Sequence, residues 1–352
     1  MKPAISILIT GAGAPGIAGT VFALRNNPDG RKINIVGVDI KTECVGQYFC
    51  DIVYKVPEPQ KKLEYIEAIM DICRRNEVQL ILPQVTKELA VFAEYQDAFY
   101  KNGIYVLVSP LAAVEIANNK FKIMEYARKS GVPVGQFWLA RNRSEILEAV
   151  SSLGYPQKNG VVKLPISNGS RGVRILTEAV NKLDAFLNEK PSGMSITLSD
   201  FLSFYDEKVI PEILVMEYLP GRELTVDAYG GQQTAVALVR TRDRIVNGIS
   251  FQGTVISHPV LESACKSLTL GLGLRYAHGF QFKEDEDGNP KLLECNPRIQ
   301  GTMAASCLAG QNFIYKGVCE VLGEADVQPI NSREGATIFY RYWGLVLGHQ
   351  KI

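Results

Sequence analysis

The sequence lacks the features that mark membrane, secreted and nucleic-acid-binding proteins. No apolar run approaches the roughly 18 residues that span a bilayer, so no membrane partner is expected. The formal net charge is only +1, which provides no bulk electrostatic attraction for nucleic acid. The seven cysteines form no CxxC pair, and their odd number without a signal peptide favours reduced thiols in the cytoplasm.

Familiar catalytic signatures are missing as well. The chain shows no Ser-His-Asp or Cys-His constellation, and the P-loop pattern GxxxxGK[ST] is absent. An ATP site in this chain would therefore have to be of another type.

The first third of the chain alternates short apolar strands with helices. The pattern predicts strands over residues 5–10, 33–38, 80–83 and 105–108, with helices reaching to about residue 25, over 63–76 and over 87–101. Such alternation implies a parallel sheet covered by helices, which is a Rossmann-like α/β arrangement that ends near Pro110.

The rest of the chain has an α+β pattern with mostly antiparallel strands. A helix carries Lys120, a glycine-rich hairpin tip follows the strand that ends at Lys163, and a series of strands begins at Leu214. We therefore predict three domains, at residues 1–110, 111–218 and 219–352. A length of 352 residues agrees with two or three modules.

The most informative segment is LLECNPR, residues 292–298, which places a carboxylate, an amide and a guanidinium at alternate positions. On a strand, Glu294 and Asn296 share one face, and Arg298 follows just beyond. Carboxylate and amide oxygens suit Mg²⁺, and arginine holds a phosphoryl group through paired hydrogen bonds. The segment predicts a magnesium and phosphate site; an acidic strand end before a proline turn is the plainer alternative.

A second candidate site surrounds Lys163, which ends a predicted strand just before the loop SNGSRG. The lysine and the backbone N–H groups around Gly169, Ser170 and Gly172 suit a triphosphate. A surface hairpin would use the same glycines for its turn, so both interpretations stay open.

The run Met216-Glu217-Tyr218-Leu219 has the pattern of a hinge whose backbone reads an adenine edge. Glu223, four residues beyond Leu219, is placed for ribose hydroxyls. A core strand followed by a Pro-Gly turn is the alternative.

Three groups of polar residues on strands extend these candidates. Gln281 precedes Glu294 across a predicted hairpin, so adjacent antiparallel strands can present both to one pocket. Arg240 and Arg242 alternate onto one face of a strand, where they can grip an anionic substrate or acyl phosphate; solvated edge charges are the alternative.

The third group, Gln84, Thr86 and Glu88, follows a buried strand of the first domain. Open α/β sheets bind ligands at this carboxyl end. Glu88 fits equally well as an acid in the first turn of a helix.

The turn GAGAPGIAG also matches the dinucleotide pattern GxGxxG through Gly11, Gly13 and Gly16, with Asp39 where a ribose-binding acid would lie. This fingerprint is weak alone, and Pro15 removes one backbone N–H donor beside the phosphate position. NAD(P) binding therefore remains an alternative of a different class.

Taken in chain order, these segments resemble the ATP-grasp superfamily over most of the sequence. The resemblance is to single-unit proteins similar to the carbamoyl phosphate synthase large subunit, with a Rossmann-like pre-ATP-grasp domain in front. It implies a two-lobed ATP-grasp fold and makes GAGAPGIAG a feature of the pre-ATP-grasp domain, which in this family usually helps to bind the acid substrate. The segments that carry it are Lys120, 161–163, 167–173, 216–223, Gln281 and 294–298.

The resemblance also implies residue roles. Two Mg²⁺ ions, or Mn²⁺ in their place, would be bound by Gln281, Glu294 and Asn296, although many relatives carry an acid at the position of Gln281. Arg298 would steady the transferred phosphoryl group. ATP would be held by Lys120 and Lys163 at the α- and β-phosphates, the loop Gly169, Ser170 and Gly172 over the triphosphate, Glu217, Tyr218 and Leu219 at adenine, and Glu223 at ribose.

The implied chemistry is an ADP-forming ligation in which a carboxylate attacks the γ-phosphate of ATP and an amine or similar nucleophile attacks the acyl phosphate. Such a reaction needs positioning and charge neutralisation without a protein nucleophile. Small-molecule acids and amines are then the partners, and a homodimer is the commonest state for such an enzyme. Phosphorylation of bicarbonate or carbamate, and nucleotide sensing without turnover, stay open as alternatives.

Overall fold

The chain folds into two compact units that do not follow the order of the sequence. The computed structural model describes residues 2–167, 172–180, 194–205, 211–324, 337–342, 344 and 346. One unit contains Met1–Asn118, Leu224–Gln281 and Cys295–Ile352, and the other contains Asn119–Glu223 and Phe282–Glu294. The predicted division into domains at residues 110 and 218 stays a prediction.

The first unit opens with a five-stranded parallel sheet that contains the four strands expected from the sequence. Its strand order is β3-β2-β1-β4-β5, so the order reverses between β1 and β4, where open α/β sheets bind ligands. An edge strand that the sequence did not reveal, β3, completes the sheet. The strands are β1 (Ile5–Thr10), β2 (Ile33–Asp39), β3 (Ile52–Lys55), β4 (Leu80–Leu82) and β5 (Tyr105–Val106).

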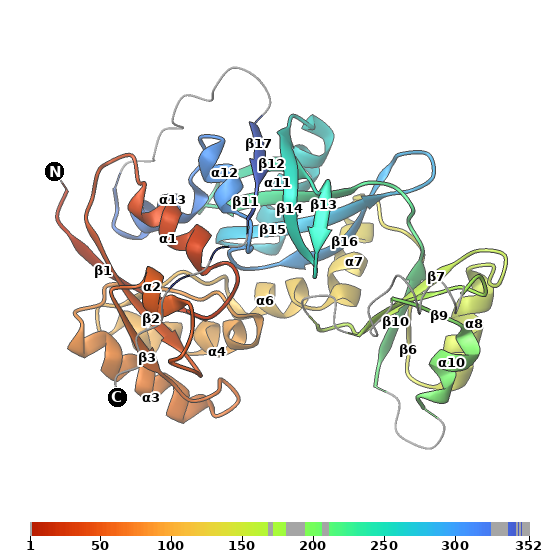
Figure 1. Ribbon diagram of the computed structural model, residues 1–352, viewed down its shortest axis with the longest axis horizontal. Coiled ribbons are helices and arrows are strands. Elements are labelled where there is room, and N and C mark those ends of the chain that lie inside the picture. Colours follow the sequence, from red (N-terminus) through yellow and green to blue (C-terminus); the bar gives the residue numbers. More distant parts are fainter. Residues whose placement is uncertain are drawn as a thin grey trace. The chain divides into compact units, whose positions relative to one another are not determined.

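Alternating apolar residues bury both faces of this sheet. Ile7 and Ile9 of β1 pack with α1 (Ile17–Arg25), whereas Leu8 packs with α3 (Lys62–Arg75) and α4 (Leu89–Glu94). Figure 1 shows α1 and α3 on opposite sides of β1 and β2. This three-layer arrangement is the Rossmann-like fold that the alternation predicts.

One helix prediction was wrong in detail. The pattern at residues 87–101 predicts a single helix, but the chain forms a 3₁₀ turn at Thr86–Glu88, then α4, and after a break at Tyr95 the short α5 (Gln96–Tyr100). The side chain of Gln96 donates to the Val106 carbonyl of β5, so this part of the chain is held by the sheet edge. None of the described helices is long and apolar enough to cross a membrane.

Helices near the C-terminus pack onto this same domain. Both α12 (Ala304–Leu308) and α13 (Phe313–Val321) contact α1. The side chain of Asn312 caps α13 by accepting from the Tyr315 N–H, and its amide donates to the Ala23 carbonyl of α1 at 2.7 Å. The Tyr315 hydroxyl adds a hydrogen bond to Asp29 at 2.8 Å. Residues nearly three hundred positions apart are thereby joined.

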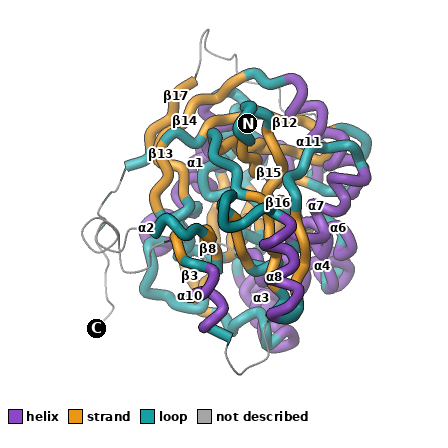
Figure 2. Tube along the Cα trace, turned by 90° about the vertical axis from the view of Figure 1, so that its right-hand side faces the viewer, coloured by secondary structure: helices purple, strands orange, loops and turns teal. Residues whose placement is uncertain are grey.

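The second part of the first unit is a mostly antiparallel sheet. Its strand order is β13-β14-β12-β11-β15-β16, and β17 (Thr337–Tyr340) pairs with β14. Figure 2 shows β13, β14 and β17 side by side. The unit boundaries fall inside three of these strands. The remaining strands are β11 (Glu223–Gly230), β12 (Ala235–Thr241), β13 (Arg244–Val246), β14 (Ile249–Ile256), β15 (Tyr276–Glu284) and β16 (Pro290–Asn296).

Helix α11 (Pro259–Leu272) packs against this sheet. His278 of β15 hydrogen-bonds Thr269 of α11, and Cys295 lies near Cys265 of the same helix. His278 and Cys295 are core residues, with exposed fractions of 0% and 5%.

The second unit contains a smaller sheet with helices on both faces. Its order is β6-β10-β7-β8-β9, and β10 is antiparallel to both neighbours. Helices α8 (Arg143–Ser152) and α10 (Leu198–Ser203) cover one face, and Met124 of α7 (Lys120–Lys129) packs on the other. Its strands are β6 (Phe137–Ala140), β7 (Gly160–Lys163), β8 (Val173–Leu176), β9 (Ser195–Ile196) and β10 (Ile213–Glu217).

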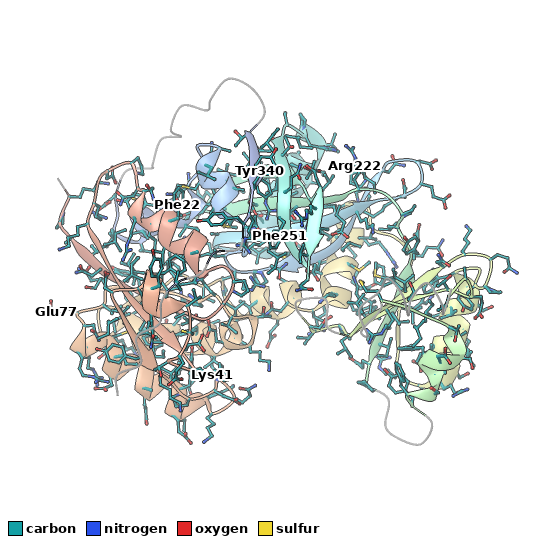
Figure 3. The ribbon with its side chains drawn as sticks, in the orientation of Figure 1. Phe22, Lys41, Glu77, Arg222, Phe251 and Tyr340 are labelled. Atoms are coloured by element: carbon teal, nitrogen blue, oxygen red, sulfur yellow. The ribbon has the colours of Figure 1, made fainter. Side chains whose placement is uncertain are left out.

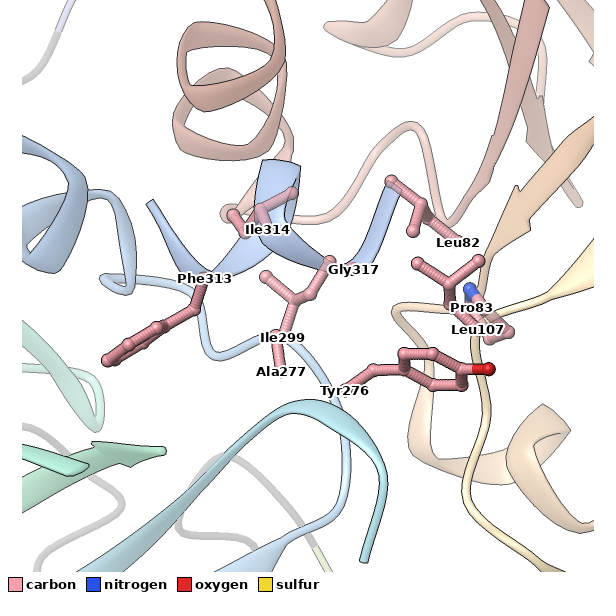
Figure 4. Close-up of a pocket in the computed structure, with 9 residues that line it drawn as sticks. All are labelled: Leu82, Pro83, Leu107, Tyr276, Ala277, Ile299, Phe313, Ile314 and Gly317. Carbon is pink, nitrogen blue, oxygen red and sulfur yellow. The ribbon is translucent and has the colours of Figure 1, made fainter. Parts of the chain in front are cut away.

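A small apolar cavity lies in the first unit where α13 meets the carboxyl ends of β4 and β5 (Figure 4). Its volume is about 10 Å³. That is room for about one water molecule, so it is too small for a substrate. The lining includes Leu82, Leu107, Tyr276, Ile299 and Ile314.

The contact between α13 and α1 gives a stability prediction. We expect Asn312→Ala to lower the free energy of unfolding of the first unit by about 1–2 kcal/mol, because it removes a helix cap and leaves the Ala23 carbonyl without this donor. The matched control is Asn142→Ala, which removes the exposed cap of α8 at a cost of about 0.5–1 kcal/mol. Urea denaturation monitors both; equal losses would contradict a special role for Asn312.

Candidate active site

Two nearly buried lysines and one carboxylate form the centre of the candidate nucleotide site in the second unit. Lys120 and Lys163 are 5% and 6% exposed. The Lys120 ammonium lies 3.3 Å from Glu294 Oε2 and donates to the Ser167 carbonyl at 2.7 Å. Asn119 caps α7 immediately before Lys120, and Lys163 ends β7, so regular elements hold both lysines.

The electrostatics of this cluster favour an anion. Burial lowers the pKa of Lys163 to about 8; Glu294 and Glu223 oppose this shift, and the charge of Lys120 adds to it. Lys283 lies 3.7 Å from Glu223, so three ammonium groups lie near two carboxylates. The positive charge left over would be relieved by a phosphate group.

The hinge segment is anchored by its own side chain. Glu217 Oε2 accepts from the Gln136 N–H at 2.9 Å, and the Glu217 N–H donates to the Gln136 carbonyl at 2.9 Å. Gly135 allows this approach, because a Cβ there would lie 3.0 Å from the carboxylate. Leu219 is buried, with an exposed fraction of 3%. The Glu217 side chain therefore serves the fold, which agrees with recognition of adenine through the backbone.

The turn after the hinge is fixed to the end of β15. Arg222 makes paired hydrogen bonds to Glu284 at 3.0 and 2.8 Å, and Figure 3 labels its side chain. Glu223, at the start of β11, lies 3.7 Å from the Lys283 ammonium, which in turn lies 5.7 Å from the centre of the Tyr218 ring. Tyr218 and Glu223 are thus brought to one lysine, and their contact with the base and ribose stays a prediction.

The glycine-rich loop can be followed only in part. Gly172 has a φ of +68°, and a Cβ there would lie 2.9 Å from Leu164, so the position requires glycine. Gly169 and Ser170 lie outside the described residues, and their roles stay predictions.

The candidate metal ligands all present oxygen to a positive charge. Gln281 Oε1 accepts from Arg242 Nη1 at 3.2 Å, Asn296 Oδ1 accepts from Arg298 Nη2 at 3.3 Å, and Glu294 faces Lys120. Arginine only donates, so these contacts fix which end of each amide is the oxygen. The donor set therefore has the oxygen chemistry that Mg²⁺ requires.

Strand alternation explains why Gln281 and Asn296 face away from α11. His278 points toward α11, so Gln281, three residues later, points to the opposite face of β15. Asn296 alternates in the same way with Cys295, which lies near Cys265 of α11.

Arg298 connects this face to the Rossmann-like sheet. Its Nε donates to the Thr86 hydroxyl at 3.1 Å and its Nη1 to the Ile299 carbonyl at 2.9 Å. Thr86 follows β4 at the switch point, where sequence analysis expected a ligand. Glu88 is 2% exposed and accepts hydrogen bonds from Tyr65 and the Val85 N–H, which is a structural role.

The two other candidate arginines differ in their surroundings. Arg240 is 2% exposed and lies 2.9 Å from the fully buried Asp227 carboxylate. Arg242 is half-buried and donates to Ser250 at 3.0 Å and to the Gly248 carbonyl at 2.7 Å. Contact of either arginine with substrate stays a prediction.

The glycine-rich turn of GAGAPGIAG packs against the chain itself. Asp39 accepts from the Gly13 N–H at 2.8 Å, and a Cβ on Gly16 would lie 3.1 Å from Gly301 Cα. Arg341 donates to the carbonyls of Pro15 at 3.2 Å and Gly301 at 2.7 Å. The Asp39 carboxylate and the Gly13 N–H, which a dinucleotide would use, are thus bonded to each other, and this gives no support to the NAD(P) alternative.

Sequence analysis missed four residues that this geometry brings out: Asp227, Gln300, Ser306 and Arg341. Gln300 lies two positions after Arg298, in the loop that contacts the glycine-rich turn. This spacing continues the alternate polar positions 294, 296 and 298, and could have marked Gln300 as a candidate site residue. Asp227 approaches Arg240 and Ser306 only after folding, so no sequence pattern marks Asp227 or Ser306.

Comparison with known protein families agrees with this geometry. Residues 7–107 match the PylC-like N-terminal domain, and residues 209–341 match the family described as ATP-grasp in the biosynthetic pathway with Ter operon. The chain is an ATP-grasp protein. The family and fold class predicted from the sequence are thereby confirmed.

Among curated relatives of this ATP-grasp protein is the carbamoyl phosphate synthase large chain of Clostridium acetobutylicum. The two are 21% identical over 251 residues, which is 68% of this chain and 21% of that protein. The chain therefore spans about a fifth of the length of that relative.

Solved structures share the fold. N5-carboxyaminoimidazole synthetase from Staphylococcus aureus, complexed with ADP, has a TM-score of 0.67 at 15% identity, covering 92% of this chain and 79% of that one. The biotin carboxylase domain dimer of Hydrogenobacter thermophilus 2-oxoglutarate carboxylase, with MgADP and bicarbonate, has a TM-score of 0.67 at 18% identity, covering 95% and 73%.

The lowered pKa of Lys163 gives a testable pH dependence. Lys163 loses its charge as pH rises through about 8, so the Kd for Mg·ATP should rise above that pH by about tenfold per unit. Lys163→Arg, which stays charged, should flatten the profile; Lys122→Arg, exposed on α7, should leave it unchanged. Calorimetric titrations from pH 7 to 9.5 measure this, and an unchanged wild-type Kd across that range would contradict the assignment.

Proposed function

We propose that the chain is a Mg²⁺-dependent ligase that activates a carboxylate as an acyl phosphate, releases ADP and transfers the acyl group to an amine or similar nucleophile. The observation that carries the proposal is the cluster of Lys120, Lys163 and Glu294. Burying two ammonium groups beside one carboxylate is unfavourable without an anionic ligand, and a polyphosphate supplies that charge.

The proposed roles follow the chemistry of each side chain. Lys120 and Lys163 hold the phosphates, the backbone of Glu217 and Leu219 contacts adenine near Tyr218, and Glu223 contacts ribose. Gln281, Glu294 and Asn296 supply oxygen ligands to magnesium, which neutralises phosphate charge during transfer. Arg298, held by Thr86, is placed to steady the transferred group. The Gly169, Ser170 and Gly172 loop is proposed to cover the triphosphate.

The reaction needs no protein nucleophile. A carboxylate oxygen of the substrate attacks the γ-phosphorus, and the bond from that phosphorus to the bridging oxygen of ADP breaks. The amine nitrogen then attacks the acyl carbon, inorganic phosphate leaves with the bridging oxygen, and the nitrogen loses a proton to solvent. Positioning and charge neutralisation account for catalysis of both steps.

Bicarbonate is the second candidate for the acid. The proteins that resemble this chain are named as a carbamoyl phosphate synthase, a carboxyaminoimidazole synthetase and a biotin carboxylase crystallised with bicarbonate. Bicarbonate offers the same attacking oxygen as a carboxylate. Release of ADP that depends on bicarbonate, without any organic acid, would favour this candidate.

The direct experiment incubates the protein with Mg·ATP, hydroxylamine and a panel of carboxylic and amino acids, with bicarbonate tested separately. Hydroxamate and ADP formed with one acid would establish acyl phosphate chemistry. ATP binding without ADP release across the whole panel would overturn the ligase proposal in favour of nucleotide sensing.

Removal of the proposed metal carboxylate gives a sharper prediction. Glu294→Gln should lower kcat/KM for Mg·ATP by at least about 100-fold, because the only carboxylate among the proposed ligands becomes neutral. Glu286→Gln, which changes an exposed acid in the same hairpin, is the matched control and should retain full activity. Equal activities of the two variants would refute the metal assignment.

A further inference from the structure

A continuous chain of hydrogen-bonded, buried polar side chains runs through the first unit. It begins at Ser306 and Asp227, passes through Arg240 and reaches Gln300. All four side chains belong to residues that are at least nine-tenths buried. A buried polar network of this kind must be well satisfied to persist, so its members have defined directions.

Asp227 is the central acceptor of this network. The residue is 0% exposed; its Oδ2 accepts from the Ser306 hydroxyl at 2.6 Å and from Arg240 Nε at 2.9 Å, and its Oδ1 accepts from Arg240 Nη2 at 3.3 Å. This paired arrangement fixes both the position and the plane of the guanidinium. Arg240 is therefore oriented by protein groups on the side that faces Asp227.

The same Nη2 of Arg240 that donates to Asp227 Oδ1 also sets the direction of the Gln300 amide. Arg240 Nη2 donates to Gln300 Oε1 at 3.3 Å. Because arginine cannot accept, the amide end that faces it must be the oxygen, and the NH₂ end must point away. Gly279 makes room for this orientation, since a Cβ there would lie 1.9 Å from Gln300 Nε2.

Gln300 Nε2 is a buried donor that has no hydrogen-bond partner among the described residues. Leaving such a group unpaired costs about 1–3 kcal/mol, so a position that keeps one usually has a use for it. Gln300 lies two residues after Arg298 and directly before Gly301, which contacts the glycine-rich turn at Gly16. The free donor thus lies in the loop that joins the phosphate-binding arginine to the turn at the β1–β4 switch point.

We infer that Asp227 is a positioning residue for the acid substrate: through Arg240 it holds the Gln300 amide so that its N–H donates to a carboxylate oxygen of that substrate. This inference rests on the proposed ligase function. Arg240 then orients the Gln300 amide. The sequence pattern had instead suggested that Arg240 binds the substrate directly. Asp227 itself touches no reacting atom.

A branch of the same network reaches the proposed metal face. Arg240 Nη1 lies 3.4 Å from the Ser250 hydroxyl, which also accepts from Arg242 Nε at 3.0 Å, and Arg242 holds Gln281. Loss of the Asp227 charge should therefore disturb Gln300 first and Gln281 more weakly, because two residues, Ser250 and Arg242, lie between Arg240 and Gln281.

The test is a double-mutant cycle with Asp227→Asn and Gln300→Ala. With the acid found in the hydroxamate panel, each single variant should raise KM for that acid by about 10- to 100-fold, with a much smaller change in KM for Mg·ATP. In the Gln300→Ala background, Asp227→Asn should add less than about twofold, since the group it positions is gone. Full additivity of the two effects would overturn the inference.

A matched control separates positioning from general destabilisation. Glu324 accepts from the buried Arg31 and from Lys2 in the same unit, and neither partner belongs to the Asp227 network. Glu324→Gln should lower thermal stability, as Asp227→Asn does, and leave KM for the acid unchanged. An equal rise in KM for this control would assign the Asp227 effect to stability alone and contradict the inference.

Crystal structures of the wild type and Asp227→Asn provide a readout that needs no substrate. We expect Arg240 to leave Gln300 Oε1 and the amide to reorient in the variant; an unchanged contact would overturn the inference. If no acid supports ADP release, the proposed function fails, and the crystal structures still decide whether Asp227 sets the Gln300 amide.

Discussion

The close approach of Gly16 to Gly301 is the constraint on which the first unit depends. Two chain segments far apart in sequence meet where a Cβ on Gly16 would lie 3.1 Å from Gly301 Cα, and Arg341 donates to a carbonyl beside each of them. This contact holds the segment that carries Asn296 and Arg298 against the carboxyl end of the Rossmann-like sheet. The glycine-rich turn is therefore needed for packing as well as for any ligand.

Charge organises the second unit in a comparable way. Lys120, Lys163 and Lys283 approach Glu223 and Glu294, and the surplus of positive charge is partly buried. Burial costs least when a group can lose its charge or gain a partner, and the lowered pKa of Lys163 shows this tendency in the ligand-free protein. A polyphosphate removes the conflict, so nucleotide binding and stability of this unit should be coupled.

Much of the fold could be read from the sequence because it rests on local patterns. Alternating apolar strands and helices identified the parallel sheet, and LLECNPR revealed the polar face of β16 through strand periodicity alone. The break at Tyr95 and the edge strand β3 were missed because neighbouring elements decide them. Asp227 and Ser306 could not be identified from the sequence for the same reason. The hydrogen bond of 2.6 Å from the Ser306 hydroxyl to Asp227 joins residues 79 positions apart.

The proposed metal ligands differ in charge, and this difference limits how tightly they could hold a free metal ion. Only Glu294 is an anion; Gln281 and Asn296 are neutral amides whose oxygens already face arginines. Mg²⁺ gives up its water reluctantly and prefers negative oxygen ligands, so a single carboxylate beside several cations holds the free ion weakly. The nucleotide phosphates supply the missing negative charge. Under the proposed function, metal and nucleotide would therefore bind together.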